Sequence, residues 1–175
     1  MCGIVGIYDR SASTPQEQLL ATATAMADTV AHRGPDDAGV WADERAGLAL
    51  GHRRLAIRDL SPTGHQPMVS SCGRYVIVYN GEIYSQDAIV RDLGARARTL
   101  RGHSDTEVIL EACAEWGVEA TVHRLIGMFA FALVDRRTGR LTLVRDRLGI
   151  KPLYWARAGS SLAFGSELTA IRAAG

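Results

Sequence analysis

The second residue of the chain, Cys2, is a candidate nucleophile once Met1 is removed. Methionine aminopeptidases remove an initiator Met when the next residue is small, and Cys qualifies. The mature chain would then carry a free α-amine and a thiol on one residue, with reference pKa values of about 8 and about 8.5. The amine could take the thiol proton directly or through a water, without a histidine. Position alone is weak evidence, because any chain can have Cys second by chance.

Residues 80 to 82, Asn-Gly-Glu, provide the second candidate group. They follow a strongly β-forming segment, and an Asn-Gly pair readily adopts turn conformations. Acyl transfer needs hydrogen-bond donors that are aimed at the developing oxyanion, and the Asn80 carboxamide with a backbone N–H of the turn would serve. The alternative interpretation is an ordinary hairpin turn.

Three charged residues, Arg54, Glu82 and Asp105, suit the two ends of a free amino acid. A guanidinium fork binds an α-carboxylate, and carboxylates bind an α-ammonium group. Taken singly, each has a structural explanation. Asp105 would be an acid in the first turn of a helix, which the helix dipole favours, and Arg54 would be a solvated strand residue.

The remaining reactive side chains suggest no metal and no cofactor. Cys113 falls on an apolar helix face as a packed thiol, and Cys72 falls in an exposed turn. No phosphate-binding glycine loop is found. The five histidines are His32, His52, His65, His103 and His123, and no two of them have the spacing of metal ligands on a helix.

Composition indicates one globular domain. The chain has 175 residues, with 20 basic and 19 acidic side chains, so no charge excess points to nucleic acid or to an anionic membrane. Three cysteines without a C-x-x-C pair predict a reducing, cytoplasmic setting. The N-terminus lacks the features of a signal peptide, and the longest apolar stretch, residues 127–134, is too short to span a bilayer.

Periodicity predicts an α+β fold with antiparallel sheets, because hairpins outnumber strand–helix–strand units. Helices are expected from a Thr14 cap and Pro15 up to Gly34, over 85–94, from a Ser104–Glu107 capping box up to Gly117, and over 166–173. Strands are expected over 3–8, 38–42, 47–58, 74–79, 129–135, 140–145, 153–156 and 162–165, with a loop over 60–67.

These motifs coincide with those of one family. The sequence resembles the N-terminal glutaminase domain of glutamine-dependent asparagine synthetases, which are class II (N-terminal nucleophile) amidotransferases. The match runs in the family's order over nearly the whole chain. Its stretches are MCGIVGIYD (1–9), HRGPDDAG (32–39), GHRRLAIRDL (51–60), GHQPM (64–68), YNGEIY (79–84), HSDTEVIL (103–110), GMFAFALVD (127–135), RDRLGIKPLY (145–154) and FGSEL (164–168).

The resemblance implies a four-layer α/β/β/α sandwich, in which two antiparallel sheets lie between helices. It implies that Cys2 attacks the side-chain amide of L-glutamine with its own α-amine as base, and that Asn80 and Gly81 form the oxyanion hole. Arg54 would pair with the substrate α-carboxylate, Leu55 and Ile57 would line the pocket through backbone groups, and Glu82 and Asp105 would lie near the α-ammonium. The products would be ammonia and a glutamyl thioester, which water converts to glutamate.

Family members carry a second domain that uses ATP and magnesium, and its S-G-G-x-D-S loop is absent from these 175 residues. We therefore expect residues 1–175 to be a glutaminase domain, which could lack its last strand or helix, with no cofactor of its own. Its partner would be an ATP-dependent synthetase domain, in cis or in trans, and a homodimer stays open. Arg33 and Asp36 are expected to form a structural ion pair, and Ser85 replaces the family's usual Asn.

Three alternatives remain. The domain or subunit could serve a different acceptor, which these residues cannot distinguish. An N-terminal nucleophile hydrolase acting on other amides is disfavoured by Arg54 and Asp105, which suit a free amino acid. A catalytically silent scaffold is disfavoured by Cys2.

Overall fold

Two antiparallel sheets form the centre of the molecule. The computed structural model describes residues 1–57 and 61–175. The first sheet has five strands in the spatial order β2 (Asp37–Asp43), β3 (Leu48–Arg54), β1 (Gly3–Asp9), β9 (Ser161–Gly165) and β8 (Tyr154–Ala158). The second has four, in the order β4 (Met68–Val69), β5 (Tyr75–Ile83), β6 (Gly127–Asp135) and β7 (Arg140–Arg145).

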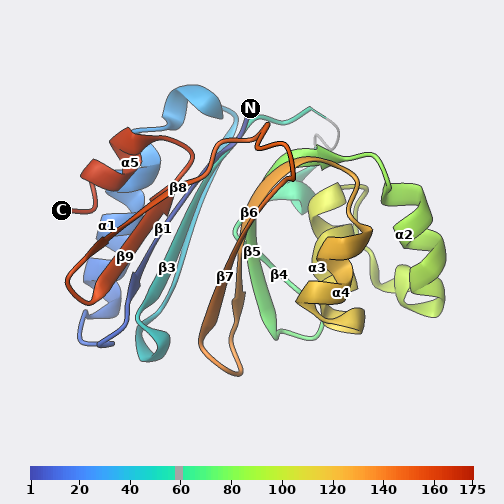
Figure 1. Cartoon of the computed structure of the whole chain (residues 1–175), viewed down its shortest axis with the longest axis horizontal. Coiled ribbons are helices and arrows are strands. Elements are labelled where there is room, and N and C mark those ends of the chain that lie inside the picture. The colour runs from blue at the N-terminus through green and yellow to red at the C-terminus, as the bar shows by residue number, and fades with distance from the viewer. Residues whose placement is uncertain (58–60) are drawn as a thin grey trace.

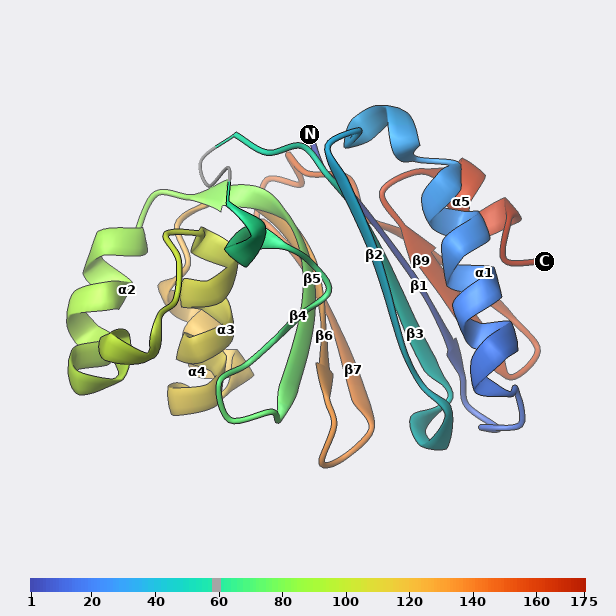
Figure 2. The ribbon, with the colours of Figure 1, turned by 180° about the vertical axis from the view of Figure 1, so that it is seen from behind.

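Helices cover the outer face of each sheet, so the molecule has four layers (Figures 1 and 2). Helices α1 (Gln16–Asp28) and α5 (Leu168–Arg172) lie on the first sheet. Helix α3 (Asp105–Trp116) lies on the second, with α2 (Gln86–Leu93) and α4 (Val118–Arg124) packed beside it. Short 3-10 helices occupy Ala31–Arg33, Glu44–Ala46, Pro62–Gly64 and Gly94–Thr99. The predicted sandwich is confirmed.

The two faces of β5 and β6 are buried in different cores. In β5, Tyr75, Ile77 and Tyr79 pack toward the helices, whereas Val76 and Val78 pack toward the first sheet. The alternation follows from the two-residue period of a strand. It explains why this segment reads as a continuous apolar run, which is typical of strands buried on both faces.

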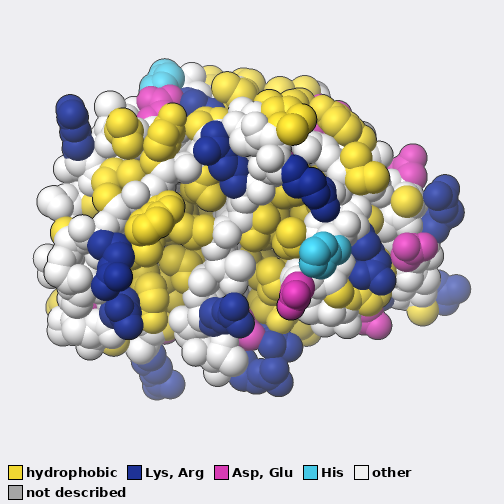
Figure 3. All heavy atoms as spheres, viewed as in Figure 1, with side chains coloured by type: hydrophobic (Ala, Val, Ile, Leu, Met, Phe, Trp, Pro, Cys, Tyr) yellow, Lys and Arg dark blue, Asp and Glu magenta, His cyan; other side chains and the backbone are white. Residues whose placement is uncertain are grey.

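The side of the sandwich at the edge strands β7 and β8 exposes some apolar side chains. Figure 3 shows a band of hydrophobic side chains over the side where β7 and β8 form the edges of the two sheets. Trp155 on β8 is 61% exposed. Within the described ranges, no helix is long and apolar enough to cross a membrane.

Most predicted elements are confirmed, including both hairpins (β6–β7 and β8–β9) and the closing helix α5. Two short elements, β4 and α4, were not predicted. In α3, Ser104 Oγ accepts the Glu107 N–H as expected, but the Glu107 carboxylate accepts from Arg101 and Gly102 instead of returning to Ser104.

The predicted cap of α1 is wrong. Thr14 donates its hydroxyl to Asp9 Oδ2 at 2.8 Å, and Pro15 takes the N-cap position without a side-chain bond. The Asp9 carboxylate stabilises the turn after β1, because it also accepts hydrogen bonds from Ser11 and Ser13. The helix ends at Asp28 rather than continuing to Gly34, and the 3-10 turn at residues 31–33 intervenes.

The strand predicted over 47–58 ends at Arg54, and residue 58 lies outside the described residues. The amides that follow have partners outside the sheet. Leu55 N–H donates to Cys2 Sγ, and Ala56 N–H donates to Asp36 Oδ2 at 2.8 Å. The chain therefore leaves the sheet where it meets the second residue of the protein.

Candidate active site

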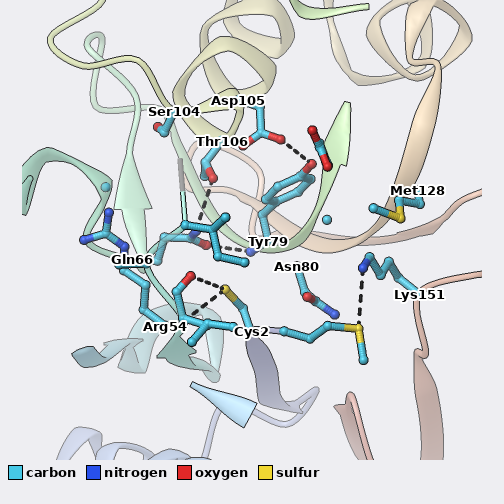
Figure 4. Close-up of a pocket in the computed structure, with 17 residues that line it drawn as sticks. Cys2, Arg54, Gln66, Tyr79, Asn80, Ser104, Asp105, Thr106, Met128 and Lys151 are labelled. Carbon is cyan, nitrogen blue, oxygen red and sulfur yellow. Dashed lines mark hydrogen bonds between the residues drawn. The ribbon is translucent and has the colours of Figure 1, made fainter. Parts of the chain in front are cut away.

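All the site residues predicted from the sequence line one pocket of about 140 Å³ at the end of the sandwich where the chain begins (Figure 4). Cys2 comes from the start of the chain, and Asn80 and Gly81 come from β5. Arg54 ends β3, and Asp105 begins α3. Three layers of the fold thus contribute to one site. The pocket lining includes Cys2, Arg54, Leu55, Ile57, Asn80, Gly81, Glu82 and Asp105.

The backbone around Cys2 is held from two sides. Ile4 N–H donates to Ser166 Oγ at 3.0 Å, and Ser166 N–H donates back to the Ile4 carbonyl at 2.9 Å. Arg33 Nε donates to the Cys2 carbonyl at 3.1 Å. Since Ser166 is fully buried, these contacts fix the direction in which the chain enters β1.

The prediction of an ion pair between Arg33 and Asp36 is wrong. Arg33 Nη1 pairs with Glu167 Oε1 at 3.0 Å, so this arginine connects the Cys2 backbone to the segment after β9. The Asp36 carboxylate holds the Ala56 amide instead. Sequence proximity suggested the pair, but the turn at Gly34 packs against β3 and directs the two side chains to different partners.

The Cys2 thiol lies in a polar contact with the residue after β3. It donates to the Leu55 carbonyl at 3.7 Å and accepts from Leu55 N–H at 3.4 Å. Burial raises the pKa of the Cys2 thiol, and the hydrogen bond from Leu55 opposes that shift. A thiol with a raised pKa needs a base before it can act as a nucleophile.

Asn80 and Gly81 lie within strand β5, so the predicted turn is wrong. They pair with Ala130 and Phe129 of β6. The reason for glycine is close approach rather than a turn, because a Cβ at Gly81 would lie 2.4 Å from the Met128 carbonyl oxygen. Pairing with a long strand outweighs the local preference of an Asn-Gly pair.

The strand still directs donors into the pocket. Tyr79 N–H donates to Gln66 Oε1 at 2.6 Å, and Ile83 N–H donates to Asp105 Oδ2 at 3.2 Å, both off the edge of β5 that faces away from β6. Because backbone amides alternate along a strand, the Gly81 N–H lies on that same edge. The Asn80 Nδ2 atom is buried without a hydrogen-bond partner in the described structure. Two donors therefore border the pocket.

Arg54 is buried rather than solvated, with 8% of its surface exposed. Its Nη1 donates to the Ser61 carbonyl at 2.9 Å. Gly64 packs directly on the guanidinium, since a Cβ there would lie 2.0 Å from Nη2. Leu55 and Ile57 follow Arg54 in the loop, and Ile57 is 73% exposed.

Tyr79 and Gln66 are site residues that the sequence did not single out. Tyr79 donates its hydroxyl to Asp105 Oδ2 at 2.8 Å, and burial with the nearby Asp105 raises the pKa of Tyr79, which keeps it a phenol. Gln66 joins the Tyr79 amide to Thr106 Oγ1, to which its Nε2 donates at 3.2 Å. The GHQPM stretch holds Gln66, but its partners lie far away in the sequence.

His52 supports the same strand from the opposite sheet. Burial lowers the pKa of His52 to about 4, so the ring is neutral, and its Nε2 donates to the Tyr79 carbonyl at 3.1 Å. Met1 and Lys151 also line the pocket, and Lys151 Nζ donates to Met1 Sδ at 3.4 Å. Lys151 lies on the side of Asn80 that is opposite to Arg54 (Figure 4).

Two antiparallel sheets between helices, with the Cys2 thiol in a pocket at their end, are the arrangement expected from the family resemblance. A solved structure with a similar fold is the glutamine phosphoribosylpyrophosphate amidotransferase from B. subtilis complexed with ADP and GMP, with a TM-score of 0.81 and 19% identity. The match covers 99% of this chain and 43% of that one. At this identity the similarity concerns the fold.

Sequence comparison gives the family. Residues 1–175 match the family described as glutamine amidotransferase domain, and the chain belongs to it. The chain is 42% identical to glutamine-hydrolysing asparagine synthetase 3 of Bacillus subtilis (strain 168), over 99% of its own length and 28% of that relative. It is 37% identical to the amidase chry2 of Gibberella zeae, over 85% of its length and 22% of that relative. The chain thus spans less than a third of these relatives.

Proposed function

We propose that this domain hydrolyses the side-chain amide of L-glutamine through Cys2 and supplies the ammonia to an ATP-dependent ligase domain of the asparagine-synthetase type. One observation carries the proposal: the Cys2 thiol shares its pocket with the buried Asn80 Nδ2, which has no hydrogen-bond partner among the described residues. A buried donor without a partner costs stability, and an oxyanion that forms during the reaction would satisfy it.

In the proposed first half-reaction, the α-amine of processed Cys2 takes the thiol proton. The thiolate attacks the amide carbon, and the carbonyl oxygen becomes an oxyanion that accepts from Asn80 Nδ2 and Gly81 N–H. When the C–N bond breaks, the protonated amine gives its proton to the leaving nitrogen, which departs as ammonia. Water then attacks the glutamyl thioester, releases glutamate and restores the thiol.

Substrate recognition in the proposal uses the remaining lining residues. The Arg54 guanidinium binds the α-carboxylate, and Asp105 with Glu82 binds the α-ammonium group. Helix α3 begins at Asp105, where the helix dipole favours a carboxylate. The backbone of Leu55 and Ile57 borders the rest of the substrate.

We propose that this half-reaction needs no cofactor, and that ATP and magnesium serve only the ligase domain. The identity to glutamine-hydrolysing asparagine synthetase 3 supports that partner. Production of asparagine from aspartate, glutamine and ATP by the protein together with its ligase domain would test it. A cytoplasmic setting and a homodimer stay predictions.

The test of the glutaminase proposal is Cys2→Ala, which keeps a small second residue and therefore permits the removal of Met1. Release of glutamate and ammonia from glutamine should disappear. Cys72→Ala is the matched control, because Cys72 is exposed and lies outside the pocket, and it should keep full activity. Glutaminase activity in Cys2→Ala would refute the mechanism.

A second candidate is a glutaminase domain that serves a different acceptor. The 37% identity to the amidase chry2 favours keeping it, since that relative bears another name. Both candidates predict the same glutaminase activity here. Ammonia transfer to an acceptor other than aspartate would select the second.

A further inference from the structure

Lys151 is a buried cation at the edge of the pocket that the proposed mechanism does not use. It is 7% exposed, and its Nζ has one described contact, with Met1 Sδ at 3.4 Å. A thioether is a weak hydrogen-bond acceptor. None of the ion pairs within residues 1–57 and 61–175 includes Lys151. Buried lysines are rare unless they are paired, so this placement calls for an explanation.

The loop after β7 holds Lys151 in place. Lys151 N–H donates to Asp146 Oδ2 at 2.9 Å, and the Lys151 carbonyl accepts from Arg145 Nε at 2.8 Å. Asp146 also accepts from the Phe129 amide, which anchors the loop to β6 beside the pocket. The backbone position of Lys151 is therefore set by the fold and does not depend on the contact of its side chain with Met1.

Removal of Met1 changes the surroundings of both Lys151 and Cys2. The ammonium loses its one described acceptor, and the Cys2 nitrogen becomes an α-amine. Met1 Sδ is five bonds from that nitrogen, so Lys151 Nζ lies within about 10 Å of it by covalent geometry. At that distance in a partly buried site, the positive charge of Lys151 should lower the pKa of the α-amine by about one unit.

We propose that Lys151 keeps the α-amine of Cys2 unprotonated at neutral pH, so that the amine is ready to act as the base. The inference rests on the proposed function and deepens it. Lys151 acts through the amine and is a positioning residue rather than a catalytic one.

The other charged groups around Cys2 carry both signs. Arg33 at the Cys2 carbonyl pairs with Glu167. Across the pocket, Arg54 and Asp105 act on the thiol in opposite directions. The titratable and charged groups that face Cys2 or line its pocket are Arg33 with Glu167, Arg54, Tyr79, Glu82, Asp105 and Lys151. Among the described residues Lys151 forms no ion pair, although the Asp146 carboxylate accepts from its backbone amide.

The experiment measures kcat/KM for glutamine from acidic to alkaline pH in the processed enzyme and in Lys151→Met, which keeps the length and the apolar stem. Removal of the charge should move the acidic limb of the profile upward by about one unit, because the amine then stays protonated to higher pH. Activity below the limb should fall about tenfold, while the alkaline plateau stays near that of the unmodified chain. Lys151→Arg should restore the original limb.

Arg157→Met on β8 is the matched control, since it removes one positive charge outside the pocket and should leave the limb in place. An unmoved limb in an active Lys151→Met enzyme would overturn the inference. So would a higher KM at every pH, which would make Lys151 a substrate ligand. Thermal unfolding checks that Lys151→Met is folded. If it is not, Lys151→Gln provides a second variant without the charge, and the same shift of the acidic limb is expected for it. Failure of the proposed function is distinguishable, because the unmodified chain would then release no ammonia at any pH.

Discussion

The pocket has two halves that are built in different ways. The proposed catalytic half consists of Cys2, Asn80 and Gly81, which lie directly before β1 or inside β5. The proposed recognition half consists of the loop formed by Arg54 and Leu55–Ile57, where β3 ends, together with Glu82 of β5 and Asp105 at the start of α3. The catalytic half is held by ladder pairing and buried hydrogen bonds. The loop of the recognition half is held by two side-chain hydrogen bonds, one that Asp36 accepts from the Ala56 amide and one that Arg54 donates to the Ser61 carbonyl.

The difference suggests a division of labour. Oxyanion stabilisation depends on donors that are fixed before the reaction, and strands fix donors well. Binding of a flexible amino acid requires charge at the correct end, and a tethered loop supplies it. Changes in the catalytic half should therefore reduce kcat, and changes in the recognition half should raise KM.

The largest of these effects is expected for Asn80→Ala. Loss of the Nδ2 donor should lower kcat by about 10² to 10³, since the contact with the oxyanion exists mainly in the transition state. KM should change little. Steady-state kinetics with glutamine checks this, and a change confined to KM would move Asn80 to the recognition half.

A smaller effect is expected for Arg54→Ala, with KM higher by about 10- to 100-fold and a modest change in kcat. The ion pair with the α-carboxylate exists in both ground and transition states, so its loss weakens binding. The KM of Arg54→Lys should lie between those of the unmodified chain and Arg54→Ala, because lysine keeps the charge but lacks the bidentate fork. A selective loss of kcat would contradict the role assigned to Arg54.

The smallest effect is expected for Asp36→Ala, which releases the Ala56 amide and leaves the strands unchanged. Loss of one hydrogen bond to a carboxylate should cost about 1 kcal/mol and raise KM several-fold. Asp37→Ala is the neighbouring control, since Asp37 pairs with His65 and lies outside the pocket. Equal kinetics in both variants would mean that the loop needs no tether.

The sequence predicted the elements well where periodicity is strong. The apolar runs of β5 and β6 and the apolar stripe of α3 are all predicted, because each is a local pattern. The prediction that the site residues share one pocket depends on the family resemblance, because no local pattern relates Cys2 to Asn80. The pocket confirms their proximity, and their individual roles stay predictions.

The failures share a physical cause. Local preference alone predicts a turn at Asn80-Gly81, because the pairing strand β6 lies nearly fifty residues away in the sequence. Thr14 was read as a cap without the carboxylate of Asp9. Gln66 and Lys151 were missed because their side chains meet partners brought together only by the tertiary fold.

The central claim is that Cys2, after removal of Met1, forms a glutamyl thioester. Acid quenching of the enzyme during turnover of glutamine, followed by peptide mass spectrometry, tests it directly. We expect an N-terminal peptide that begins at Cys2 and carries one glutamyl group, which should be absent in Cys2→Ala. A glutamyl group on any other residue, or full activity in a chain that retains Met1, would contradict it.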